Sequence, residues 1–173
     1  MANFYLFDNN IFITLAQYAK DRALWDWLAW KGSQGLFGIP DCILDEYKSD
    51  NSDMKKWIEK NLIIGHPTDL REECMAELMA TLPDFSDATK PGQDADQPLV
   101  ACAMALNKAK TGSYASGPVY IVTHETPKKP LKLRLKIPDA CAHYQIKWVT
   151  TYDLLGKEGC FVTHIDKNTN EIE

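Results

Sequence analysis

The chain has 173 residues, of which 45% are hydrophobic and 25% charged, and its formal net charge at pH 7 is −5. This composition is ordinary for a globular protein, and the length predicts one domain. The chain lacks an apolar run of about 18 residues and the positively charged start of a signal peptide, so we expect a cytoplasmic protein with no membrane partner. The acidic balance argues against a large basic surface for nucleic acid, but not against a small one.

Short β-type runs alternate with helical segments along the chain. The expected strands are 4–7, 36–39, 62–65, 119–123 and 147–150. The expected helices are 11–18, 21–31, 41–48, 53–62, 69–82 and 94–110. Pro40 suits the first turn of the third helix, and Ser52 and Thr68 are expected N-caps of the next two. The turn-rich stretches 83–93 and 111–118 are expected loops.

This alternation predicts an α/β fold with a central, mostly parallel sheet of four to five strands flanked by helices. We expect a single domain over residues 1–163 and a polar C-terminal tail over 164–173. The five cysteines are widely spaced and include no C-x-x-C pair, which argues against a zinc site and favours buried free thiols.

Acidic residues follow or face the predicted strand ends. Asp8 follows the first strand and Glu125 the fourth, while Glu46 and Asp96 lie near the starts of two helices. Because the carboxyl ends of parallel strands meet at one edge of a sheet, we expect these carboxylates to converge. Converging carboxylates repel one another, and hard divalent ions such as Mg²⁺ or Mn²⁺ relieve that repulsion and activate water. The pattern therefore indicates metal-dependent phosphodiester hydrolysis.

Each of these acids also has a purely structural explanation. Asp8, and likewise Asn10, could cap the helix that follows it. Glu46 could lie on a solvated helix face, and Asp96 could favour the dipole of its helix. Glu125 could simply end a strand.

Five basic residues with no acid among them lie in residues 128–136, here called the basic segment: Lys128, Lys129, Lys132, Arg134 and Lys136. Apolar residues alternate with the last three of them, so an extended segment with one solvated face would explain the pattern. The same side chains are the best candidates for contacts with an RNA backbone.

The chain resembles the PIN-domain ribonucleases, a family that includes the toxins of type II toxin–antitoxin systems. The matching stretches, in order, are "YLFDNNIFI", "ILDEY", "DADQPLVACAMA" and "YIVTHE". The stretches "WDWLAWKGSQGLFGIPDCILDEY" and "PLKLRLKIPDACAHY" are similar to a PIN-like branch that is catalogued only as a domain of unknown function. The resemblance covers residues 5–155.

This resemblance implies a PIN-like three-layer fold and a Mg²⁺- or Mn²⁺-dependent endoribonuclease. Asp8, Glu46 and Asp96 match the first three metal-binding acids of that family, and Asn10 and Thr123 match its supporting polar positions. The fourth acidic position, where Asp is commoner in the family, is taken by Glu125. The resemblance also implies RNA as the substrate, an antitoxin protein as a partner, and compatibility with a homodimer.

Two other functions stay open. A catalytically inactive PIN-like binding module would keep the fold without the reaction. A receiver-type signalling domain would bind phosphate in an acidic pocket at parallel strand ends, but it needs adjacent acids after the first strand, where this chain has Asp8 followed by two asparagines.

Overall fold

A parallel sheet of five strands forms the centre of the computed structural model, which describes residues 2–45, 52–65, 68–85, 95–109, 117–128 and 134–160. The strands are β1 (Phe4–Phe7), β2 (Phe37–Ile39), β3 (Ile63–Ile64), β4 (Val119–Val122) and β5 (Lys147–Val149). Their order across the sheet is β3-β2-β1-β4-β5, and every neighbouring pair is parallel. The predicted α/β class is therefore confirmed.

β1 lies at the centre of the sheet because all four of its residues are apolar and can be buried on both faces. Tyr5 pairs with Phe37 of β2 on one side and with Tyr120 of β4 on the other. A receiver-type domain has the strand order 2-1-3-4-5. The observed order differs, so the receiver interpretation is wrong.

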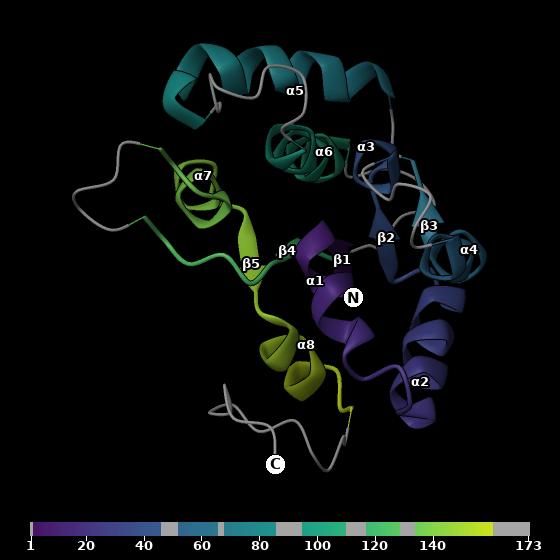
Figure 1. Ribbon diagram of the computed structural model, residues 1–173. Coiled ribbons are helices and arrows are strands. Elements are labelled where there is room, and N and C mark those ends of the chain that lie inside the picture. Colours follow the sequence, from purple (N-terminus) through teal and green to yellow (C-terminus); the bar gives the residue numbers. More distant parts are fainter. Residues whose placement is uncertain are drawn as a thin grey trace.

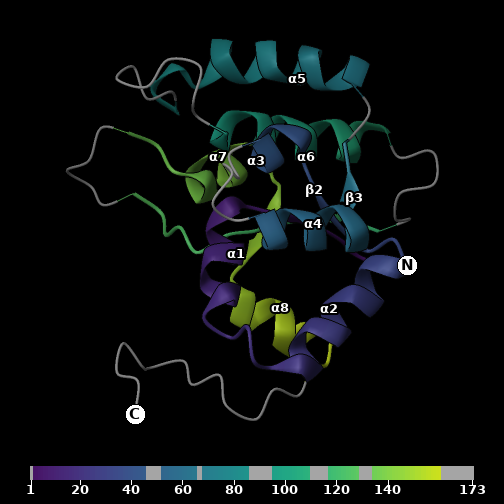
Figure 2. The same ribbon diagram turned by 45° about the vertical axis from the view of Figure 1, so that its right-hand side comes forward.

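Helices cover both faces of the sheet and complete three layers (Figure 1). They are α1 (Asn9–Ala16), α2 (Arg22–Ser33), α3 (Asp41–Asp45), α4 (Ser52–Asn61), α5 (Thr68–Thr81), α6 (Asp96–Ala109), α7 (Ile137–His143) and α8 (Thr151–Lys157), with a short 3-10 turn, η2 (Pro83–Phe85). Helices α3, α6 and α7 lie on one side of the sheet, and α1, α2 and α8 lie on the other. Figure 2 shows α5 on the outer side of α6.

The direction of α6 brings its first residue, Asp96, to the carboxyl edge of the sheet. Near the other end of the helix, Asn107 Oδ1 accepts a hydrogen bond from the N–H of Val119, the first residue of β4. α6 therefore runs antiparallel to the strands. Its middle is buried between the sheet and α5, and the small side chains of Ala101, Ala103 and Ala105 permit that close packing.

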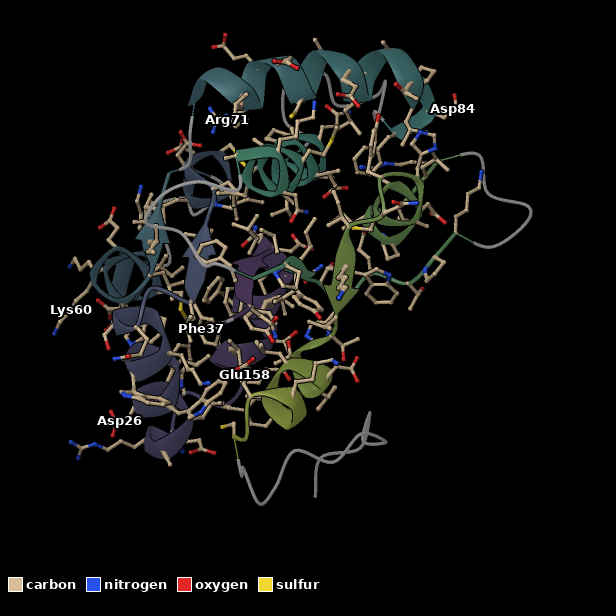
Figure 3. The ribbon with its side chains drawn as sticks, turned by 180° about the vertical axis from the view of Figure 1, so that it is seen from behind. Asp26, Phe37, Lys60, Arg71, Asp84 and Glu158 are labelled. Carbon is tan, nitrogen blue, oxygen red and sulfur yellow. The ribbon has the colours of Figure 1, made fainter. Side chains whose placement is uncertain are left out.

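A buried ionic cluster joins α8 to β1 and α2. Glu158, just beyond α8, accepts hydrogen bonds from Tyr5 Oη at 2.6 Å and from Lys31 Nζ at 2.6 Å. Figure 3 shows Glu158 between α8 and α2. Burial alone would raise the pKa of Glu158, but the hydrogen bonds from Lys31 and Tyr5 outweigh burial and hold this pKa below its ordinary value of 4.5.

Several element boundaries differ from the sequence predictions. α1 begins at Asn9, two residues before the predicted start, and β3 has two residues rather than four. η2 lies at the start of the predicted loop 83–93, and neither α7 nor α8 was predicted. The expected end of the third helix, residues 46–48, and the expected tail, 164–173, lie outside the described residues.

The five cysteines are free thiols, and Cys74, Cys102 and Cys141 are buried, which confirms the expectation for these three. Among the helices of the described ranges, none is long and apolar enough to cross a membrane.

Candidate functional site

Asp8 lies directly after β1, at the carboxyl end of the central strand. Its backbone N–H still belongs to the sheet, because it donates to the carbonyl oxygen of Val122 in β4 at 3.0 Å. Asp8 also occupies the N-cap position of α1, but its side chain makes no capping hydrogen bond. Only 5% of the residue is exposed. The interpretation of Asp8 as a helix cap is therefore wrong.

Asn10 and Thr123 instead hold the Asp8 carboxylate. Asp8 Oδ2 accepts hydrogen bonds from Asn10 Nδ2 at 2.6 Å and from Thr123 Oγ1 at 2.7 Å. Thr123 is completely buried, and its N–H donates to the carbonyl oxygen of Val149 in β5. Asn10 Oδ1 accepts from the N–H of His124 at 3.2 Å. The structure thus brings the three predicted polar residues together at the ends of β1 and β4.

Glu125 lies two residues beyond Thr123, and both of its carboxylate oxygens have partners. Its N–H donates to Thr123 Oγ1 at 3.1 Å. Glu125 Oε1 accepts from Lys136 Nζ at 2.6 Å, and Oε2 accepts from the N–H of Ile137, the first residue of α7, at 2.9 Å. Glu125 therefore binds the start of α7. A direct bond from Oε1 to a metal ion would require Lys136 to leave.

Asp96 is also paired with the basic segment. Its Oδ2 accepts a hydrogen bond from Arg134 Nη2 at 3.0 Å. The Asp96 side chain is 21% exposed and the Arg134 side chain 34%. Arg134 and Lys136 belong to one short stretch of chain, so the basic segment joins Asp96 to Glu125.

The backbone N–H groups at both ends of the basic segment donate to the same carboxylate, that of Asp139. Asp139, in the first turn of α7, accepts hydrogen bonds from the N–H of Lys128 at 3.0 Å and from the N–H of Lys136 at 2.8 Å. The charged groups of Arg134 and Lys136 contact acids within the protein, so these two partly exposed side chains do not form a freely solvated face. Lys129 and Lys132 lie outside the described residues.

Three of the four predicted acids thus belong to one chain of contacts at the carboxyl edge of the sheet. Thr123 joins Asp8 to Glu125, and the basic segment joins Glu125 to Asp96. Glu46 comes directly after the last residue of α3 and lies outside the described residues.

The donor chemistry of these residues fits a hard divalent cation. Asp8, Asp96 and Glu46 would offer carboxylate oxygens, the ligands that Mg²⁺ and Mn²⁺ prefer. Within the described ranges, no three acidic, histidine or cysteine side chains are grouped closely enough to hold a metal ion. Glu46 is outside those ranges, and Arg134 contacts a carboxylate oxygen of Asp96. A complete ligand set would therefore need Glu46 to join and Arg134 to move.

His124 lies beside these contacts, although no ligand spacing pointed to it. Its Nε2 is 3.0 Å from Thr151 Oγ1, and its ring packs edge-on against Tyr152 with 6.3 Å between ring centroids. Burial lowers the pKa of His124 below its ordinary value of 6.5, which favours the neutral imidazole.

Sequence reasoning missed the partners of the acids and one buried amide. Arg134 and Lys136 are two residues apart, which places both on one side of an extended segment, and this spacing could have suggested two acids as partners. Gln97, next to Asp96, is only 8% exposed, and its Nε2 has no hydrogen-bond partner among the described residues. Glutamine is mostly exposed in proteins, so no pattern in the sequence marks it.

Comparison with curated proteins gives no match, and comparison with solved structures gives none either. A family model does match, over residues 5–162. That range includes every site residue described above, from Asp8 to Tyr152. The chain therefore belongs to the family described as Domain of unknown function (DUF4411).

Proposed function

We propose that this chain is a PIN-like, metal-dependent endoribonuclease that acts in the cytoplasm and hydrolyses RNA phosphodiester bonds. The observation that carries the proposal is the burial and orientation of the Asp8 carboxylate. Its carboxylate is buried at the carboxyl end of the central strand, makes no helix cap, and is oriented by Asn10 and Thr123. Open parallel sheets bind ligands at this edge.

In this proposal Asp8, Asp96 and Glu46 would hold Mg²⁺ or Mn²⁺. Bound there, such an ion would supply charge for the phosphate oxygens and lower the pKa of an attacking water. Asn10 and Thr123 fix the orientation of Asp8, so that its oxygens need no rearrangement when substrate arrives. Glu125 positions the start of α7 through Oε2, and its Oε1 would reach the ion once Lys136 has left.

The test is cleavage of a labelled single-stranded RNA by the purified full chain, with Mn²⁺ or Mg²⁺ and with chelator. We expect cleavage only with metal, and a loss of roughly 100-fold or more in Asp8→Asn and in Asp96→Asn, because each removes a ligand charge. Asp26→Asn is the matched control, since Asp26 pairs with Arg22 on the outer face of α2 and its side chain is 75% exposed (Figure 3). Equal rates in wild type, Asp8→Asn and Asp96→Asn would refute the assignment.

The same proposal takes a small antitoxin protein as the partner and the toxin role as the biological one. Carboxylates that accept Arg134 and Lys136 from their own chain have the chemistry to accept a cationic side chain from another protein. Expression of the chain alone should arrest growth, and coexpression of a small protein that co-purifies with it should restore growth. Normal growth on expression of an active chain would contradict the toxin role while leaving the nuclease role intact.

A catalytically inactive PIN-like binding module is the second candidate. The ion pairs Asp96–Arg134 and Glu125–Lys136 favour it, because they occupy two of the predicted acids. RNA binding that resists chelator, with no cleavage under any metal, would identify this function.

A further inference from the structure

The two ion pairs of the candidate site share one geometry. In each pair the acid is the more buried partner: Asp96 is 21% exposed and Glu125 17%, while Arg134 is 34% exposed and Lys136 38%. The carboxylates are therefore the more enclosed partners, and about a third of each basic side chain is exposed to solvent, although Arg134 Nε itself is buried. Such a pair can open by rotation of the long basic side chain without movement of the acid.

The backbone that carries the two cations is held in place. The N–H of Leu135 donates to the carbonyl oxygen of Asp84 at 3.3 Å, and Figure 3 shows Asp84 at the end of α5 that lies over α7. The N–H of Lys136 donates to Asp139, and the N–H of Ile137 donates to Glu125. The cationic side chains can therefore leave the acids while their backbone stays beside the site.

The charges of the site balance in two ways. In the described structure Arg134 and Lys136 bring two positive charges to the two negative charges of Asp96 and Glu125. One divalent cation brings the same positive charge. Replacement of both basic side chains by one ion would keep the total charge beside Asp96 and Glu125 unchanged, and it would free two cationic groups next to the site.

We propose that Arg134 and Lys136 are exchangeable counter-ions of this site, paired with Asp96 and Glu125 when no metal is bound and with RNA phosphates when metal is bound. This inference rests on the proposed nuclease function. The exchange makes metal and RNA binding cooperative, because the metal binds the acids and the RNA phosphates bind the released cations. The arginine fork suits two phosphate oxygens, and the lysine acts as a point charge.

The test measures Mn²⁺ affinity by calorimetry and, separately, the affinity of the Mn²⁺-loaded chain for a short single-stranded DNA that serves as a phosphate-backbone probe. The variants are Arg134→Gln and Lys136→Gln. The matched control is Lys108→Gln, which removes the same charge from a pair with Glu77 on α5 at 2.8 Å. We expect each test variant to bind Mn²⁺ roughly tenfold more tightly than the control does, because the ion has no competing cation to displace. We expect the same variants to bind the oligonucleotide more weakly.

These opposite changes distinguish an exchangeable counter-ion from a structural residue. Weaker binding of both Mn²⁺ and oligonucleotide would mean that Arg134 and Lys136 only support the fold, and would overturn the inference. Unchanged Mn²⁺ affinity in both variants would overturn it too, while the nuclease proposal stands. Absence of Mn²⁺ binding in wild type and variants would overturn both proposals. If one variant fails to fold, the other decides, since each carries its own ion pair.

Discussion

At the scale of single residues, the side chain of Thr123 determines how the Asp8 carboxylate is presented. The Thr123 hydroxyl donates to Asp8 and accepts from the N–H of Glu125, so one buried oxygen joins the ends of two strands. It also accepts from Asn10 Nδ2 at 3.3 Å. The loss of this hydroxyl would remove its hydrogen bonds to Asp8 and Glu125 at a buried position, which is costly.

We therefore predict that Thr123→Val lowers the free energy of unfolding by about 1–3 kcal/mol, although valine has a similar shape. Thr123→Ser keeps the hydroxyl and is the control for its loss. Urea titrations of both variants and wild type would measure the difference. Equal stability of the valine and serine variants would show that the hydroxyl contributes nothing.

A second prediction at this scale concerns Glu158 and pH. The pKa of Glu158 in the folded protein lies below its ordinary value of 4.5, so the unfolded chain binds a proton more readily. This stabilisation is fully present above pH 4.5 and is lost as the pH falls through the folded pKa. Glu158→Gln should therefore reduce the gap in stability between pH 7 and pH 4, as measured by thermal unfolding. A gap as large as that of wild type would contradict this account.

The sequence predicted residue roles well where one local rule applied and poorly where a contact depended on distant chain segments. Asp8 and Asn10 follow a buried apolar strand, and that rule sufficed to place them at a sheet edge. The contact between Arg134 and Asp96 spans 38 positions and connects the segment before α7 to the start of α6. Alternation within the basic segment showed that its basic residues share a side, but not that the side faces acids.

At the scale of elements, helix α2 passes α4 at a glycine. A Cβ added to Gly32 would lie 1.9 Å from the carbonyl oxygen of Asn61, the last residue of α4. The Asn61 carbonyl belongs to the backbone and cannot move aside as the tip of a flexible side chain can, so position 32 requires glycine. In α8 a Cβ on Gly156 would meet nothing within 4 Å.

These two glycines give a matched prediction. Gly32→Ala should destabilise the fold by about 1–3 kcal/mol or more, because α2 and α4 must separate. Gly156→Ala should stabilise it by about 0.5–1 kcal/mol, because alanine is the better helix former. Denaturant midpoints of the two variants should move in opposite directions. Midpoints that move together would contradict the packing described for α2 and α4.

The five strands were predictable as elements because each is short, rich in apolar residues and bounded by turn residues or helices. The helices α7 and α8 were not, for physical reasons. Each has only seven residues, which is too short for a helical period to stand out. The start of α7 combines one tertiary contact, the hydrogen bond from the N–H of Ile137 to Glu125, with local signals, Pro138 in the first turn and the capping bond from the N–H of Lys136 to Asp139.

At the scale of the whole molecule, the net charge of −5 means that the RNA substrate of the proposed nuclease would approach an acidic protein. The basic segment is the expected place of contact, and two of its five cations are paired with acids in the described structure. In chelator, we predict that the logarithm of RNA affinity falls with the logarithm of salt concentration with a slope no steeper than roughly −2, from three phosphate contacts at about −0.7 each.

Fluorescence anisotropy over a salt series would measure this slope. A slope steeper than roughly −3.5 would exceed what all five basic residues can give, and would place the phosphate contacts elsewhere on the protein.

The position of β1 also has a consequence for the synthesis of the chain. β1 is the first strand to be translated, yet it pairs with Val119–Val122 of β4, so one of its edges has no partner until most of the protein has been made. At about 5–20 residues per second the wait is roughly 6–20 seconds. Thr123, Glu125 and the basic segment are made later still. The proposed nuclease site therefore cannot assemble on a short nascent chain, and the chain would become active only near the end of its synthesis.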